Sequence, residues 1–268
     1  MFIIASLVIG SQLRYALRAD LGFETDAIIT LSRPVVHNRT VFAPDRAREP
    51  AIAEISKTMV LIEKIRQLVG VEQVIRVWRQ PTDRLGIHFG GGKLKGSDEK
   101  PVEVSVHYGD EHYVPFYGMK LVAGRNMLPG DGIRELLISE SYAHALGFAD
   151  VNKAVGREVN FIRDEAFTVA GVVADFYETS FHRASLPVLI KHDPAKENSI
   201  AIKIAAKGMG AGEMKTLIAR IEKDWKAVYP GSPFGYTFLD ESIAQLYADD
   251  LRTELLTNVA MGITVFIS

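Results

Sequence analysis

The sequence predicts an α+β fold in which two strand–helix–strand units frame a β-rich insert. Two observations support it. Strand-like and helix-like periodicities recur in the same order near both ends of the chain, and a long stretch of short predicted strands separates them. With 268 residues, of which 47% are hydrophobic and 24% charged, the chain can bury a core.

The first unit begins with a predicted strand at 26–32, which Pro34 closes. A helix is predicted from Pro50 to Gly70, and a second strand follows at 71–78. Apolar residues recur in the helix at spacings of three and four, namely Ile52, Ile55, Met59, Ile62, Ile65 and Leu68 or Val69. We therefore expect one face of this helix to be buried.

The second unit begins with an alternating strand at 199–206 and a glycine-rich turn at 208–212. A helix follows and ends before Pro230, and the return strand is predicted at 234–239. The helix has a single apolar stripe, formed by Met214, Leu217, Ile218, Ile221, Trp225 and Val228. Two such units usually share one sheet in a split βαβ, or ferredoxin-like, arrangement, so we expect the four strands in one sheet.

The insert begins after Pro81, and its glycine-rich stretch at 86–96 is interpreted as a hairpin tip or mobile loop. Short strands then dominate, predicted at 102–108, 120–123, 136–139, 155–161, 167–173 and 187–191. Two short helices are predicted at 111–117 and 140–146. The insert is therefore expected to be a small β-rich α+β subdomain.

Composition excludes several classes of function. The chain has no Cys, which excludes disulfide frameworks, thiolate metal sites and cysteine nucleophiles. Its net charge of −2 gives no global basic field, so nucleic acid is not expected as a partner.

The glycine clusters do not match nucleotide-binding motifs. Gly92 and Lys93 are followed by Leu94, and Ile87 stands where a phosphate-binding loop needs its first glycine. The cluster of Gly208, Gly210 and Gly212 opens a helix, but Glu213 occupies the position of the third motif glycine. We therefore predict no nucleotide-binding site at either cluster and interpret the cluster at 208–212 as a turn.

The search for metal and catalytic motifs also gives no site. His107 and His112 flank Asp110 and Glu111, but their spacing of five does not fit a zincin-type helix, and we interpret the histidines as surface residues. Ser139 is interpreted as a helix cap, because no nucleophile elbow is present. Asp249 and Asp250 are explained by solvation or a membrane-facing hinge. We predict no catalytic, cofactor-binding or metal-binding residue and no enzyme activity. An enzyme with an unusual site is the weaker rival hypothesis.

The two termini leave two interpretations open. The runs at 2–10 and 255–268 carry no charge, and each is too short to cross a bilayer. A signal peptide is disfavoured, because no basic residue precedes the first run. The runs could be terminal helices packed on a core or on each other. Alternatively, the chain could be an extramembrane domain between two transmembrane helices, of which it retains the adjoining halves.

Several strings along the chain resemble the MacB-like periplasmic core domain of ABC transporter permeases, in the MacB/FtsX-like permease family. They occur in family order at 21–26 (LGFETD), 116–126 (FYGMKLVAGRN), 136–148 (LLISESYAHALGF), 154–157 (AVGR), 167–176 (FTVAGVVADF), 180–182 (SFH), 186–187 (LP), 233–240 (PFGYTFLD) and 246–247 (LY). The likeness covers nearly the whole chain.

The resemblance implies a porter-like split βαβ subdomain at 23–80 and 192–246, with an inserted Sabre-like subdomain at 81–191. Residues 1–22 and 247–268 would be stalks and partial transmembrane helices. It implies a domain of a permease in the bacterial inner membrane, facing the periplasm or cell exterior.

The implied partners are an ABC ATPase, a second permease copy and a periplasmic adaptor protein. No cofactor is implied. Movement of the flanking helices would rearrange the two subdomains for export or mechanotransmission. A standalone periplasmic binding or adaptor domain is the alternative. The resemblance assigns no cargo and no functional residue.

Overall fold

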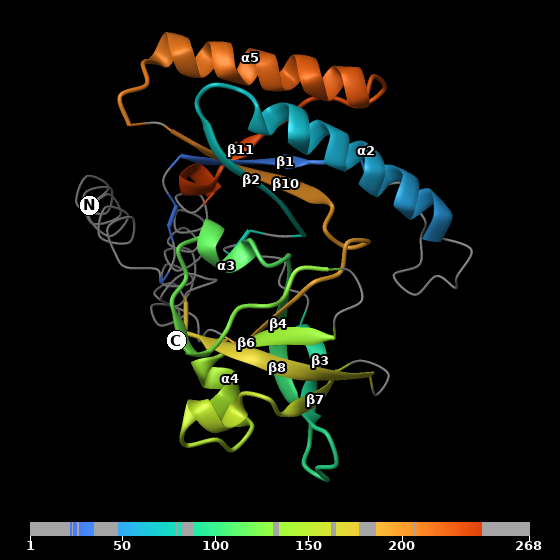
Figure 1. Cartoon of the computed structure of the whole chain (residues 1–268), viewed down its shortest axis with the longest axis vertical. Coiled ribbons are helices and arrows are strands. Elements are labelled where there is room, and N and C mark those ends of the chain that lie inside the picture. Colours follow the sequence, from blue (N-terminus) through green and yellow to red (C-terminus); the bar gives the residue numbers. More distant parts are fainter. Residues whose placement is uncertain are drawn as a thin grey trace, which may run out of the picture.

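The computed structural model describes residues 22, 24–25, 27–34, 48–78, 80–81, 88–130, 134–161, 165–176, 186–205 and 207–242. The predicted terminal runs and Asp249 and Asp250 lie outside these residues. The described chain is a mixed α+β structure with two sheets (Figure 1).

Sheet A has four strands, and it contains the four strands that the sequence predicts to share a sheet. They are β1 (Ile28–Ser32), β2 (Val71–Val77), β10 (Ser199–Ile204) and β11 (Thr237–Phe238). Their order is β11-β1-β10-β2, and every neighbouring pair is antiparallel. The prediction of one shared sheet is therefore confirmed.

Helices α2 (Arg48–Arg66) and α5 (Ala211–Val228) cover one face of sheet A (Figure 1). Alternate residues of β1 and β10 point toward these helices, as the period of two requires. The resulting core includes Ile29, Leu31, Ile200 and Ile202 from the strands, and Leu61, Ile62, Ile65, Leu217, Ile221 and Trp225 from the helices. The amphipathic stripe of α5 is thus confirmed.

The predicted stripe of α2 is only partly correct. Met59 is 38% exposed and Val69 87% exposed, whereas Thr58 and Leu61 are buried. Thr58 can be buried because its hydroxyl lies 2.9 Å from that of Tyr229 and donates to the carbonyl oxygen of Glu54 at 2.7 Å. A hydrogen bond to a residue far along the chain therefore changes which face is buried.

The ends of two elements, helix α2 and strand β11, also differ from the prediction. Helix α2 ends at Arg66 rather than next to Gly70, since residues 67–70 form turns. Strand β11 has two residues instead of six, because the chain turns helical at Leu239, which is fully buried.

Sheet B has seven strands, all from the predicted insert. They are β3 (His88–Leu94), β4 (Val102–Tyr108), β5 (Leu121–Gly124), β6 (Glu135–Ser139), β7 (Glu158–Phe161), β8 (Glu165–Val173) and β9 (Val188–Lys191). The order is β5-β8-β6-β9-β4-β3-β7, and β7 also pairs with β8. All strands except β5 therefore form a closed circuit. The short elements α3 (Tyr113–Phe116), α4 (Glu140–Ala145) and the 3-10 helix η2 (Val151–Ala154) complete it.

The interpretation of the glycine-rich stretch as a hairpin tip or mobile loop is wrong over 88–94. That segment is β3, which pairs with β4 and β7. A Cβ on Gly92 would lie 2.1 Å from the hydroxyl oxygen of Tyr142, so close packing, not a turn, requires glycine there.

A junction core joins the two sheets. Helix α3 lies between them (Figure 1), and its residues Tyr113, Val114 and Phe116 share one apolar cluster with residues of both sheets. From the sheet A side come Ile28, Ile75, Val77, Ala201 and Leu239, and from the sheet B side Leu137, Val173, Val188 and Ile190. The two sheets are therefore packed through one continuous apolar layer.

The backbone crosses between the sheets at the end of β2. The N–H of Trp78 donates to the carbonyl oxygen of Tyr108 at 3.0 Å, and Val77 forms an isolated bridge with Gly109. Val77 is also the ladder partner of Ser199, at the start of β10. The chain therefore leaves sheet A and returns to it at neighbouring positions.

Candidate functional site

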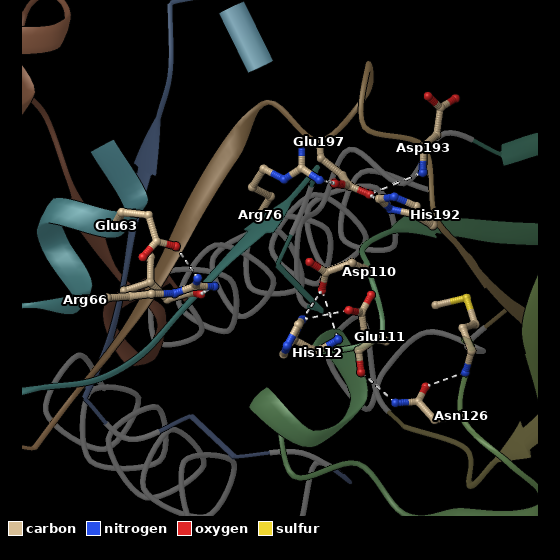
Figure 2. A network of polar contacts seen from close by, with 12 residues as sticks. Glu63, Arg66, Arg76, Asp110, Glu111, His112, Asn126, His192, Asp193 and Glu197 are labelled. Atoms are coloured by element: carbon tan, nitrogen blue, oxygen red, sulfur yellow. Dashed lines mark hydrogen bonds and ion pairs between the residues drawn. The ribbon is translucent and has the colours of Figure 1, made fainter. Parts of the chain in front are cut away.

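The strongest candidate site is a polar cleft of about 230 Å³ between the two sheets. One wall comes from α2 and β2, and the other from the segment that follows β4 and from His192 after β9 (Figure 2). The cleft is lined by Met59, Ile62, Arg66, Arg76, Asp110, Glu111, His112, Gly130 and His192. It is smaller than most pockets for drug-sized ligands, which span roughly 300–1,000 Å³.

Asp110, Glu111 and His112 come together at the turn before α3 (Figure 2). The N–H of His112 donates to Asp110 Oδ1 at 2.9 Å, and His112 Nδ1 lies 3.3 Å from the same oxygen and 3.6 Å from Glu111 Oε1. Asn126 supports the turn by donating to the carbonyl oxygen of Glu111 at 2.6 Å. The three ligand atoms lie within 4.8 Å of one another, a donor set that could accept a divalent cation.

His107 does not belong to this cluster. It is 3% exposed, its Nδ1 lies 3.1 Å from the Tyr113 hydroxyl, and its ring packs 5.8 Å from that of Phe176. The interpretation of both histidines as surface residues is therefore correct for His112 and wrong for His107. Strand β4 is covered on both faces, so alternation does not expose His107.

A buried carboxylate links the two walls of the cleft. Glu197 has a fully buried side chain, and its Oε2 lies 3.4 Å from Arg76 Nη2 in β2. Its Oε1 lies 2.6 Å from His192 Nδ1 and accepts the N–H of Asp193 at 3.2 Å (Figure 2). Such a buried pair adds little net stability, but leaving one partner uncompensated is costly.

The second arginine of the cleft is also neutralised. Arg66 Nη1 lies 2.7 Å from Glu63 Oε1, and Arg66 Nη2 donates to the carbonyl oxygen of Val74 at 3.0 Å. Both guanidinium groups that line the cleft therefore already have carboxylate partners.

The amines of Lys191 and Lys196 lie over aromatic rings. Lys191 Nζ lies 4.1 Å from the ring centre of Phe167, and burial lowers the pKa of this amine. Lys196 Nζ donates to the Tyr108 hydroxyl at 2.8 Å, and burial raises the pKa of that phenol. These contacts give both lysines a structural role in packing.

The remaining sequence candidates have structural roles. Ser139 is the N-cap of α4 and accepts the N–H of Tyr142 at 3.2 Å, which confirms the cap interpretation. Gly210 is the N-cap of α5, where its N–H donates to Glu213 Oε2 at 2.8 Å. A carboxylate of the chain itself therefore occupies this helix N-terminus. Gly92 and Lys93 lie within β3.

Sequence reasoning found the string of Asp110, Glu111 and His112 but not the cleft. The opposite wall comes from Arg66, Arg76 and His192, which lie on separate elements. No local motif links them, and only the junction of the sheets brings them together. Within the described residues, no helix combines the length and the apolarity needed to cross a membrane.

The fold resembles that of a known class of extracytoplasmic domains. The periplasmic region of MacB from Actinobacillus actinomycetemcomitans superposes with a TM-score of 0.50 at 15% identity, covering 86% of this chain and 96% of that one. A domain of a putative permease from Porphyromonas gingivalis gives a TM-score of 0.47 at 18% identity, covering 80% and 90%. The extracellular domain of the noncanonic ABC-type transporter YknZ from Gram-positive bacteria gives 0.45 at 14%, covering 78% and 97%.

The sequence matches the family model of the MacB-like periplasmic core domain over residues 1–224. The chain belongs to that family, whose members are components of ABC transporter permeases. No curated protein matches the chain.

Proposed function

We propose that this domain couples ATP hydrolysis by a partner ATPase in the cytoplasm to a conformational change outside the inner membrane, for export or mechanotransmission. In this proposal the domain is carried between the first two transmembrane helices of a permease. A second permease copy and a periplasmic adaptor protein complete the assembly. The domain itself binds no nucleotide and catalyses no reaction.

The observation that carries the proposal is the position of the first and last strands of sheet A. Strands β1 and β11 are antiparallel neighbours, with Ile29 opposite Phe238. The beginning of β1 and the end of β11 therefore lie at the same end of the sheet. Two membrane helices attached to these strands would emerge side by side, as a domain inserted between consecutive spans requires.

The strand order of sheet A supports a porter-like subdomain at 23–80 and 192–246. Read across the sheet, the strands are the fourth, first, third and second of its four strands in chain order, and both helices lie on one face. A split βαβ fold is expected to have this strand order, which supports the proposed assignment. Sheet B, whose strands all fall between 88 and 191, corresponds in this proposal to the Sabre-like insert at 81–191.

The test uses the parent permease, purified together with its partner ABC ATPase. We expect the ATPase to copurify and its turnover to change when residues 22–242 are replaced by a short flexible linker. If the parent gene encodes no further apolar spans, or if the ATPase turnover rate does not change on replacement, a standalone binding or adaptor domain is favoured instead.

A second test addresses the stalks and partial membrane helices proposed at 1–22 and 247–268. Deleting 1–19 and 248–268 should improve solubility and leave the melting temperature nearly unchanged, because uncharged runs contribute little to a core when lipid normally covers them. A large loss of stability would show that these runs are core helices, and the membrane proposal would fail.

A further inference from the structure

The segment that leads into β1 is fixed to the sheet B side of the molecule before it enters sheet A. The N–H of Glu24 donates to the carbonyl oxygen of Tyr117, directly after α3, at 2.7 Å. Gly22 has a φ of +81°, and a Cβ there would lie 2.9 Å from the Cβ of Phe176, which follows β8. The backbone of this segment is therefore in close contact with α3 and with the end of β8.

The side chain of Glu24 connects the same segment to sheet A. Its carboxylate forms an ion pair with Lys203 of β10. Lys203 also donates to the carbonyl oxygen of Phe116 at 3.3 Å, and only 17% of its side chain is exposed. One lysine thus contacts the leading segment, sheet A and α3 together.

Gly118 gives the clearest sign that this contact is built closely. It has a φ of +62°, and a Cβ there would lie 2.8 Å from Cγ of Glu24 and 2.9 Å from Oε1. Any other L-residue would be strained at this φ and would displace the Glu24 side chain.

The end of β11 is held in the same region. Leu239 is fully buried in the junction core, together with Ile28 at the start of β1 and with Tyr113 and Phe116 of α3. The described chain therefore enters and leaves sheet A beside the apolar layer that joins the sheets.

We infer that Glu24, Phe116, Tyr117 and Lys203 form a junction clamp that makes the two sheets move as one rigid body when the flanking segments move. This inference rests on the proposed function for the origin of that movement. It differs from the sequence-based expectation that the two subdomains rearrange relative to each other. Separating the sheets would break the clamp and expose the junction core, whereas moving them together preserves both.

The absence of Cys allows a direct test on the whole chain. Nitroxide labels at Lys153→Cys, on η2 beside sheet B, and Lys223→Cys, on α5, would report the distance between the two sheets by pulsed electron paramagnetic resonance. Both positions are exposed. We expect a single narrow distance distribution, and a broad or bimodal one would overturn the rigid-body inference.

Variants then test the clamp itself. Lys203→Met and Glu24→Ala should each at least double the width of the distribution or add a second distance. Lys95→Met is the matched control, because it removes a 2.8 Å ion pair between the turn after β3 and Glu158 of β7, which does not involve sheet A, and should leave the distribution unchanged. If Lys203→Met fails to fold by circular dichroism, Glu24→Ala decides, since 60% of that side chain is exposed.

An unchanged distribution in the folded clamp variants would overturn the clamp. The measurement needs neither membrane nor ATPase, so it is separate from the test of the proposed function. If the distance distribution broadens in both variants but the ATPase turnover rate does not change when the domain is replaced, the clamp is supported and the coupling role is rejected.

Discussion

A Cβ added to Gly91 would lie 1.3 Å from the carbonyl oxygen of Val102 on the neighbouring strand. The pairing register of β3 and β4 shifts between Phe89 and Gly92, so the backbones approach unusually closely at this point. Only glycine satisfies this contact without moving one of the strands.

Gly91→Ala should therefore destabilise the domain by about 3 kcal/mol or more, because a backbone atom cannot move aside as a side chain can. Urea unfolding followed by circular dichroism measures the change. The control is Gly212→Ala in α5, where a Cβ meets nothing within 4 Å. It should be neutral or stabilising by about 0.5–1 kcal/mol. Equal midpoints for the two variants would contradict the close approach.

Ser139→Ala should cost about 2 kcal/mol of unfolding free energy, because the buried hydroxyl serves two elements. It accepts the N–H of Tyr142 at the start of α4 and the N–H of Val188 in β9 at 2.9 Å. Ser97→Ala is the control, since that hydroxyl accepts one exposed N–H, from Glu99. If the two variants unfold at the same urea concentration, Ser139 does not join α4 to β9.

Glu135 should give the domain a measurable acid sensitivity. Two hydrogen bonds from Arg125, at 2.5 and 2.8 Å, are the main cause that lowers the pKa of Glu135 below its ordinary 4.5. A lowered pKa in the folded state stabilises the protein above about pH 4.5, and this stabilisation is lost as the pH falls through the folded-state pKa.

Glu135→Gln should therefore lower the unfolding free energy at neutral pH by less than about 1 kcal/mol, since an ion pair with an exposed partner is screened. The difference from the wild-type chain should disappear in strong acid. Urea titrations at several pH values measure this, and a difference that stays constant with pH would exclude Glu135 as its cause.

Zinc and ATP should not raise the melting temperature of the purified domain at modest concentrations. His107 and His112 lack the spacing of a zinc-binding helix, and the glycine clusters lack the pattern of a phosphate-binding loop. A rise of several degrees with zinc that His112→Ala abolishes would instead identify the cleft as a metal site.

Sequence periodicity predicted α5 well because Leu217, Ile221 and Trp225, spaced by four residues, all lie in the apolar core between the helices and sheet A. It predicted the buried face of α2 less well, because Thr58 is buried through a hydrogen bond to Tyr229, which local sequence does not reveal. The glycines of β3 suggested a turn, but contacts with Val102 and Tyr142 from other elements explain them.

The cleft shows the same limit. The adjacent residues Asp110, Glu111 and His112 are visible in the sequence, but Glu197 is not, since its importance comes from Arg76 and His192 on other segments. The spacing of residues along the sequence can reveal a site within one element. A site whose residues come from separate segments can be recognised only from the three-dimensional structure.

The pairing of Val77 with Ser199 places both ends of the chain segment that forms sheet B on one rung of the sheet A ladder. The polypeptide departs from and rejoins one rung of a ladder, so the intervening segment can lengthen, shorten or be exchanged while the strand order of sheet A stays the same.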